Sequence, residues 1–435
     1  MKLRINNFAK IKSADFSIDG ITVIVGNNNT GKSTVGKILA SIFNSLVDIQ
    51  KRVENAKIRR MQEEAWSTVT TEIPFNTKHG LRSLYPRFLD SESKKLQNFL
   101  FSDDEKIQKK ISDDYANYIY NRLYNENDKV DINDIKDFVF KTLKKTSTIS
   151  DSMFEEQIVS VYFQKVFNGQ INDIHNKDSN ATVKIIVKDC SINIEFKNER
   201  VKKIIRNFNI TNTATYIENP YIIDKFNQSR LFGRFNSMPI LENDLLKKLF
   251  PNDDENFEKK AMNLLFVEDS LKDINDVLNS IVPGDFLQKD KFIYKKEGVD
   301  IDVNSLSTGL KSFGIIKQLL LNGGIKNKDI LILDEPEIHL HPDWQLKYAQ
   351  IIVLLQKTFN LNIIITTHSS HFFEAIDVYS KIYGIRNRCN YYLSDEKEGY
   401  AEFTDVTEDS RPIFTSLVEP NLRLDEIKVQ NNIED

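Results

Sequence analysis

The feature that most constrains the fold is an eight-residue segment, Gly26 to Ser33, which lies between two contrasting patterns. Before it, Ile21–Val25 is a continuous and mostly β-branched run, which predicts a buried strand. After it, apolar residues at helical spacing predict a helix; they are Ile38, Ile42, Leu46, Ile49 and Val53. The segment itself fits the pattern GxxxxGK[ST] at every fixed position. A strand–loop–helix unit with this loop is typical of phosphate binding, whereas a plain glycine-containing turn before a helix is the alternative.

The chemistry of phosphate binding requires this order of residues. Gly26 and Gly31 allow the backbone to turn successive N–H groups inward, and the helix N-terminus adds its own N–H groups and dipole. Lys32 would reach the β- and γ-phosphates, and the Ser33 hydroxyl would bind Mg²⁺. The residues predicted to contact ATP here are Gly26, Asn27, Asn28, Asn29, Thr30, Gly31, Lys32, Ser33 and Thr34.

A second strand ends in two adjacent carboxylates. Ile330–Leu333 is apolar throughout, as in a parallel sheet buried on both faces, and Asp334 and Glu335 follow at once. Burying carboxylates is costly unless a cation or hydrogen-bond donors satisfy them. We therefore expect Asp334 to hold Mg²⁺ through its water shell and Glu335 to polarise a water molecule. An apolar run that ends in two acids is common, so the prediction depends on the phosphate loop.

Two further segments place polar residues at element ends. Ser307, Thr308 and Gly309 open a predicted helix that runs through Leu321, and they could form a second phosphate cradle or a simple helix N-cap. A buried strand from Leu361 ends at His368, whose imidazole could donate a hydrogen bond to the γ-phosphate and stabilise the transition-state charge. A zinc site is an alternative for the four histidines of this region, which are His339, His341, His368 and His371.

The remaining chain alternates between strand-rich and helical, highly charged stretches. Alternating patterns predict hairpins at 183–196 and 292–303. We divide the chain into an N-terminal lobe (1–45), a compact helical insertion (46–181), strands (182–225), a second helical insertion (226–284) and a C-terminal lobe (285–435). The basic clusters in the first insertion are mixed with acids, which favours solvated helix faces over a nucleic-acid patch.

Composition narrows the classes of protein to consider. Lys and Arg number 59 against 63 Asp and Glu, so no global basic field indicates nucleic-acid binding. The two cysteines, Cys190 and Cys389, give no disulfide framework and fit a reducing cytoplasm. The N-terminus carries no apolar signal-peptide core, and no run of roughly 18 apolar residues would span a membrane.

The order of these motifs resembles that of ABC-type ATPases, in the branch that contains SMC, RecF and OLD proteins. The similar stretches are NNFAKI near the start, LSTGLKS as signature, DEPEIHLHP after the second strand and THSSHFFEAI at the third. The resemblance implies an α/β head with a P-loop and a mixed sheet that includes an N-terminal antiparallel part, carrying helical insertions. It also implies that two heads sandwich ATP, with Ser307 and Gly309 of one copy capping a γ-phosphate bound to the other.

Within that branch, GITVIVGNNNTGKSTVGKIL and the C-terminal third resemble stand-alone ATPases of bacterial anti-phage defence operons, of the Septu type. This resemblance implies a cytoplasmic homo-oligomer, at least a dimer, that senses a trigger and controls a separate effector such as an HNH nuclease. A RecF- or SMC-like DNA-maintenance ATPase that binds duplex DNA is the alternative. A transporter ATPase is disfavoured by the insertions and the signature.

The sequence departs from transporter ATPases in several places. Thr308 replaces the first glycine of the signature, and His341 stands where transporters place an aspartate. No Q-loop glutamine can be assigned among the candidates Gln62, Gln97 and Gln157. Only 67 residues follow His368 (435 − 368) and they carry no Toprim signature, so we expect no nuclease activity from this chain.

Overall fold

The computed structural model describes residues 1–72, 93–124, 130–226, 238–251, 271–288 and 291–430. It divides the chain into two compact units, one formed by Met1–Val47 with Val159–Asp435 and the other by Asp48–Ile158. Each unit has its own hydrophobic core.

Among the described residues, an eleven-stranded sheet forms the centre of the larger unit, in the order β6-β5-β4-β1-β2-β14-β13-β3-β12-β11-β7. Its strands are β1 (Lys2–Phe8), β2 (Ile11–Ser17), β3 (Ile21–Gly26), β4 (Ala181–Val187), β5 (Cys190–Lys197), β6 (Arg200–Arg206), β7 (Ala214–Ile217), β11 (Ile330–Asp334), β12 (Asn362–Thr367), β13 (Cys389–Lys397) and β14 (Tyr400–Asp405). The predicted α/β class, with a mixed sheet and an N-terminal antiparallel part, is confirmed.

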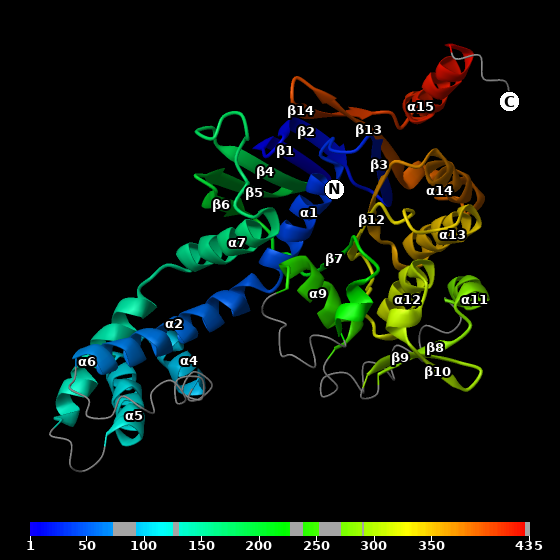
Figure 1. The fold of residues 1–435 in the computed structure, drawn as a ribbon. Coiled ribbons are helices and arrows are strands. Elements are labelled where there is room, and N and C mark those ends of the chain that lie inside the picture. Colours follow the sequence, from blue (N-terminus) through cyan, green and yellow to red (C-terminus); the bar gives the residue numbers. More distant parts are fainter. Residues whose placement is uncertain (73–92, 125–129, 227–237, 252–270, 289–290, 431–435) are drawn as a thin grey trace. The chain divides into compact units, whose positions relative to one another are not determined.

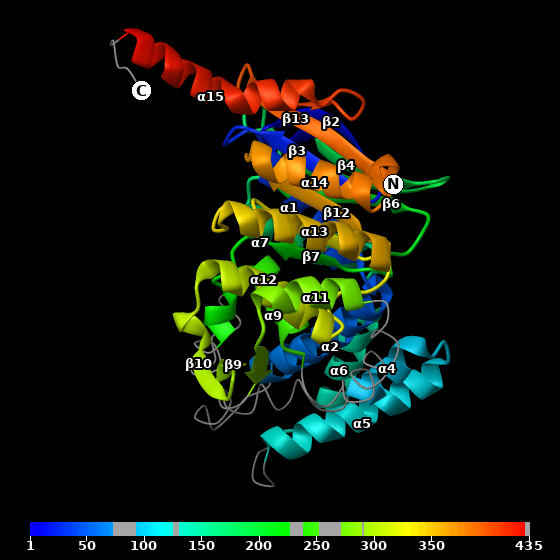
Figure 2. The same ribbon diagram turned by 90° about the vertical axis from the view of Figure 1, so that its right-hand side faces the viewer.

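The parallel part of the sheet positions the predicted motifs. Strands β3, β12, β11 and β7 pair in parallel, with Leu333 opposite both Ile365 and Ile217. Every residue of β3, β7 and β11 is buried, which explains their continuous apolar runs. Helix α1 (Lys32–Leu46) covers one face, and α13 (Pro342–Phe359) and α14 (Ser370–Ile382) cover the other (Figures 1 and 2). Because β3, β12, β11 and β7 run parallel, their carboxyl ends lie at the same edge of the sheet.

The antiparallel part contains the predicted hairpin β4–β5, which adds to β1. The sequence did not predict the β13–β14 hairpin, which joins the two parts of the sheet because β13 pairs with β3 and β14 with β2. The P-loop strand thus has β12 on one side and β13 on the other.

The helix predicted after the phosphate loop is interrupted. Helix α1 ends at Leu46 and α2 (Ile49–Glu72) begins after two residues with other backbone angles, extended at Val47 and left-handed at Asp48, where φ is 50°. The apolar spacing continued through this break, so periodicity alone predicted one helix.

The described part of the smaller unit, 48–158, consists of helices around a core that includes Met61, Tyr115 and Ile119. Its helices are α2, α4 (Ser93–Phe101), α5 (Glu105–Leu123), α6 (Ile132–Ser147) and the first part of α7 (Asp151–Phe167). The unit is shorter than the segment 46–181 that the sequence set apart. The end of α7 belongs to the sheet, because Phe163 packs on Phe8 and Phe196.

The segment predicted as a second insertion, 226–284, contains helices α9 (Ile240–Leu249) and α11 (Lys272–Ile281), and its other parts lie mostly outside the described residues. In the described chain, a three-stranded antiparallel sheet follows, with β8 (Asp285–Gln288), β9 (Phe292–Lys296) and β10 (Val299–Asp302). The pairing of β9 with β10 confirms the predicted hairpin. Helix α12 (Thr308–Leu321) then packs in the same core, and α15 (Arg411–Gln430) closes the described chain.

Candidate active site

The predicted phosphate loop connects β3 to α1, and Lys32 is the first helical residue. Gly31 takes the left-handed conformation, with φ 82°, which glycine adopts without strain. Gly26 is required for a different reason, because a Cβ there would lie 2.1 Å from the backbone oxygen of Ser394 on β13. The nine residues predicted from Gly26 to Thr34 thus comprise the last residue of β3, the loop and the first turn of α1.

The Lys32 side chain is almost fully buried and lies across the loop. Its Nζ donates hydrogen bonds to the backbone oxygens of Gly26, at 2.8 Å, and Asn27, at 2.6 Å. Burial lowers the pKa of Lys32, against the opposing effect of the carboxylates of Glu335 and Asp334. Because Nζ lies 3.9 Å from Glu335 Oε1, the predicted phosphate-binding and catalytic residues share one site.

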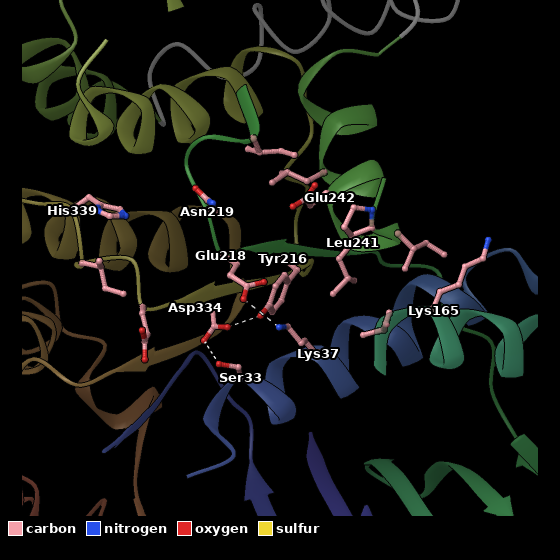
Figure 3. Close-up of a pocket in the computed structure, with 17 residues that line it drawn as sticks. Ser33, Lys37, Lys165, Tyr216, Glu218, Asn219, Leu241, Glu242, Asp334 and His339 are labelled. Carbon is pink, nitrogen blue, oxygen red and sulfur yellow. Dashed lines mark hydrogen bonds and ion pairs between the residues drawn. The ribbon is translucent and has the colours of Figure 1, made fainter. Parts of the chain in front are cut away.

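Asp334 is the centre of a buried hydrogen-bond network. Its Oδ1 accepts from the Ser33 hydroxyl at 3.0 Å and from the Thr366 hydroxyl, and its Oδ2 accepts from the Tyr216 hydroxyl at 2.5 Å. Figure 3 shows Ser33, Tyr216 and Asp334 converging from three elements, with dashed lines between them. Burial first, and then the charge of Asp334, raises the pKa of Tyr216 well above its ordinary value. The phenol therefore stays protonated and donates this hydrogen bond to the carboxylate.

Glu335 directly follows Asp334, after the end of β11, and lines a cavity next to this network. Its backbone is left-handed, with φ 49°, an unusual conformation for a glutamate that is found disproportionately at functional sites. The Glu335 N–H donates to the Thr366 backbone oxygen and hydroxyl, both at 3.1 Å. The predicted His368 follows β12, and its Nδ1 lies 3.6 Å from Glu335 Oε1. The site thus brings Lys32, Glu335 and His368 together.

A cavity of about 600 Å³ adjoins Ser33, Asp334 and Glu335 (Figure 3). Its far walls come from the end of α7, the segment after β7 and the start of α9. Lys37 and Glu218 form an ion pair of 3.2 Å in it, next to the Tyr216 ring. The other lining residues are Lys165, Val166, Asn219, Ile222, Pro239, Ile240, Leu241, Glu242, Leu245, Ile338 and His339.

The signature segment has local structural roles of its own. Ser307 is the N-cap of α12, and its Oγ accepts from the Leu310 N–H at 3.4 Å. Gly309 lies against Trp344, so that a Cβ would come within 2.7 Å of the indole. Thr308 Oγ1 is 2.9 Å from the Tyr221 hydroxyl. Among the described residues that line the cavity, none comes from Ser307–Gly309.

The sequence prediction missed the residues that support the carboxylates. Tyr216, Thr366, Thr367 and Glu337 all lie at the ends of the parallel strands or just after them. The available signal was a pair of threonines before His368 and a tyrosine in a predicted strand. Of the predicted histidines, His341 accepts from the Asp343 N–H at the start of α13, and His339 packs edge-on against Tyr221 at 6.1 Å.

The three glutamines considered for a Q-loop lie in α2, α4 and α7, in the helical unit. Strand β7, the neighbour of β11 on the side away from β12, is instead followed by Glu218 and Asn219, both of which line the cavity. Within the described ranges, no group of three or more His, Cys, Asp or Glu side chains could hold a metal ion. The oxygens of Ser33 and Asp334 are nevertheless hard donors of the kind that Mg²⁺ prefers. Water and phosphate oxygens would supply the remaining ligands.

The family model described as AAA ATPase domain (AAA_15) matches residues 1–373, which include both carboxylates, the phosphate loop and His368. The chain belongs to this family. Membership of the family implies that the chain binds ATP. In the described part of the chain, no helix combines the length and apolar character needed to cross a membrane.

Several curated proteins are similar to this AAA ATPase. The retron Vc95 probable ATPase of Vibrio cholerae serotype O1 biovar El Tor is 25% identical over 387 residues, or 83% of this chain and 68% of that protein. The Septu protein PtuA of Bacillus thuringiensis is 33% identical over 114 residues, 23% of this chain and 28% of PtuA. The endonuclease GajA of Bacillus cereus (strain HuB5-5) is 22% identical over 428 residues, 89% of this chain and 56% of GajA. The predicted relationship to Septu-type ATPases is confirmed.

The chain spans little more than two thirds of the retron ATPase and smaller shares of PtuA and GajA. Among solved structures, the SMC head bound to the C-terminal winged-helix domain of ScpA aligns over 94% of this chain and 98% of that one, with 12% identity and a TM-score of 0.43.

Proposed function

We propose that this AAA ATPase hydrolyses ATP at the site formed by Lys32, Ser33, Asp334 and Glu335. The observation that carries the proposal is the Ser33 hydroxyl bonded to Asp334 at 3.0 Å, with Lys32 and Glu335 alongside. A hydroxyl at the start of the P-loop helix beside a strand-end carboxylate is the arrangement that holds a nucleotide-bound Mg²⁺.

The chain's own residues have distinct roles in this proposal. Backbone N–H groups from Gly26 to Thr34, together with Lys32, bind the phosphates. Ser33 and Asp334 would hold Mg²⁺, which supplies Lewis-acid stabilisation of the phosphate charge. Glu335 orients the attacking water and accepts its proton. His368, 3.6 Å from Glu335, stabilises charge that develops on the γ-phosphate.

We further propose that two copies act together. The resemblance to ABC-type heads implies that Ser307–Gly309 of a second copy caps the γ-phosphate. The segment is compatible with this role because it lines no part of the cavity beside Ser33 in the described chain and begins a helix whose first N–H groups can bind an anion. ATP would then stabilise the assembly in proportion to its preference for the associated state.

The proposed biological role is control of a separate effector, such as an HNH nuclease, in an anti-phage defence system. Similarity to a retron ATPase and to PtuA supports the role. The helical unit 48–158 and the region 226–284 are the parts that we propose read the trigger or contact the effector, because neither contributes a predicted catalytic residue. GajA is named an endonuclease, and this chain covers 56% of it. We propose that the nuclease activity of the system resides on another chain.

The test of ATP hydrolysis is the Glu335→Gln variant. We expect it to bind ATP with near-normal affinity and to lose turnover, because the amide cannot accept the proton of water. Glu195→Gln is a matched control. The side chain of Glu195 is 25% exposed, against 24% for Glu335, and it pairs with Lys202 in the antiparallel part of the sheet. Normal hydrolysis by Glu335→Gln would refute the assignment.

The test of the defence role is co-purification of the tagged chain with the products of neighbouring genes, with mass and ATPase activity measured together. A complex with a nuclease or toxin whose activity responds to ATP supports the proposal. A lone dimer whose ATPase activity rises with duplex DNA, in a salt-sensitive manner, would overturn it in favour of DNA maintenance.

A further inference from the structure

Glu337 is a buried carboxylate next to the proposed site that the predicted mechanism does not use. Only 3% of its surface is exposed, and within the described chain its Oε2 is buried without a hydrogen-bond partner. A carboxylate in this environment loses its hydration, which is costly unless its contacts compensate. Its position therefore requires an explanation beyond packing.

The other oxygen of Glu337 makes specific contacts with the segment that carries His368. Its Oε1 accepts from the Thr367 hydroxyl and from the His368 backbone N–H at 3.2 Å. The hydroxyl oxygen of Thr367 in turn accepts a hydrogen bond from the Ser369 N–H at 3.0 Å, and Ser369 is the N-cap of helix α14. Glu337 thus ties the loop after β11 to the loop after β12.

These contacts determine where the imidazole of His368 lies. Its Nδ1 is 3.6 Å from Glu335 Oε1 and 3.9 Å from Glu337 Oε1. The side chain of His368 is 44% exposed, so packing alone does not fix it. The fixed backbone N–H and the two carboxylates around Nδ1 are the contacts that orient the ring toward Glu335.

We propose that Glu337 is a positioning residue for ATP hydrolysis, which acts through Thr367 and His368. The inference rests on the proposed function, because it assigns a role within the same reaction. Glu337 does not touch the reacting atoms in this proposal. It holds the backbone from which His368 reaches the site, much as a supporting hydrogen bond holds a catalytic group at its productive distance.

The experiment compares steady-state ATP hydrolysis by Glu337→Ala, Thr367→Val and Thr367→Ser. We expect Glu337→Ala and Thr367→Val to lower kcat by roughly 10- to 100-fold and to change KM by less than about threefold, because positioning affects the transition state more than ATP binding. Thr367→Ser retains the hydroxyl and should keep most of the wild-type rate. Thr367→Val changes little in shape, so it carries the test if Glu337→Ala does not fold.

A matched control separates positioning from stability. Asp173 is 4% exposed and accepts backbone N–H bonds from His175, at 2.8 Å, and Asn176, at 3.3 Å, away from the site. Asp173→Ala should lower the melting temperature without a selective loss of kcat. Equal losses of kcat in Asp173→Ala and Glu337→Ala at matched stability would overturn the inference.

A double variant tests whether Glu337 acts through His368. If it does, adding Glu337→Ala to His368→Ala should lower kcat by less than about threefold. A full additional loss in that background would overturn the inference. Absence of hydrolysis in the wild-type protein, or normal hydrolysis by Glu335→Gln, would instead refute the proposed function itself.

Discussion

The Tyr216→Phe substitution tests how much the Asp334 network depends on a residue outside the predicted motifs. The buried Tyr216 hydroxyl donates to Asp334 Oδ2 at 2.5 Å, while the Ser33 and Thr366 hydroxyls donate to Oδ1. Phenylalanine keeps the ring but leaves Oδ2 without this donor. A hydrogen bond to a charged group contributes about 1.5–3 kcal/mol to the free energy of unfolding. Removing a residue that hydrogen-bonds to a metal-binding carboxylate typically lowers the affinity for the metal by about 10- to 100-fold.

The assay has two readouts, denaturant unfolding and the MgCl₂ concentration for half-maximal ATP hydrolysis. We expect Tyr216→Phe to lose about 1.5–3 kcal/mol of stability and to need roughly 10- to 100-fold more Mg²⁺. Tyr294→Phe is the control, because the buried Tyr294 hydroxyl accepts from the Gly284 N–H at 2.8 Å outside the site. It should lower stability without moving the Mg²⁺ dependence. Unchanged Mg²⁺ dependence in Tyr216→Phe would refute the reasoning.

Two further predictions follow from single positions. Gly31→Ala should abolish the ATP-induced rise in melting temperature, because a left-handed φ of 82° costs about 1–2 kcal/mol in alanine and the Cβ would lie 2.8 Å from Ala401 Cβ. Gly298 has the same φ, and a Cβ there would have nothing within 4 Å, so Gly298→Ala should carry only the backbone strain and keep the ATP-induced rise in melting temperature. An equal loss of that rise in both variants would contradict this explanation. Burial raises the pKa of Glu337 in the folded protein above its value in the unfolded chain. The protonated side chain therefore adds to the free energy of unfolding. This contribution is complete below the unfolded-state pKa and is lost as pH rises through the folded-state pKa. The melting temperature of Glu337→Gln relative to wild type should therefore increase from acid to alkaline pH, and a constant difference would contradict the cause given for the shift.

The sequence predicted the parts of the site that lie within continuous motifs. The P-loop pattern needs Gly31 in a left-handed conformation, and the apolar run before Asp334 needs burial on both faces, so both elements could be placed from local chemistry. Strand-end logic also placed His368 at the same edge as Asp334, because parallel strands align their carboxyl ends.

The remaining parts depend on which strands are neighbours, which one sequence does not specify. Tyr216 was within a predicted strand, yet its role follows from the pairing of β7 with β11. Glu337 and Thr367 meet only because β11 and β12 are adjacent. The β13–β14 hairpin escaped prediction because its strands carry few apolar residues toward their ends, where side chains are exposed.

The position of β13 has a consequence for synthesis of the chain on the ribosome. Strand β3 and the phosphate loop are made long before one of the two neighbours of β3, the strand β13, which begins at Cys389. Until then, the nascent P-loop strand lacks the Ser394 backbone that packs against Gly26. A newly made chain should therefore acquire a finished nucleotide pocket only after β13 has been made. Fragments that stop at residue 373, where the family match ends, would expose the edge of β3 and be prone to aggregate.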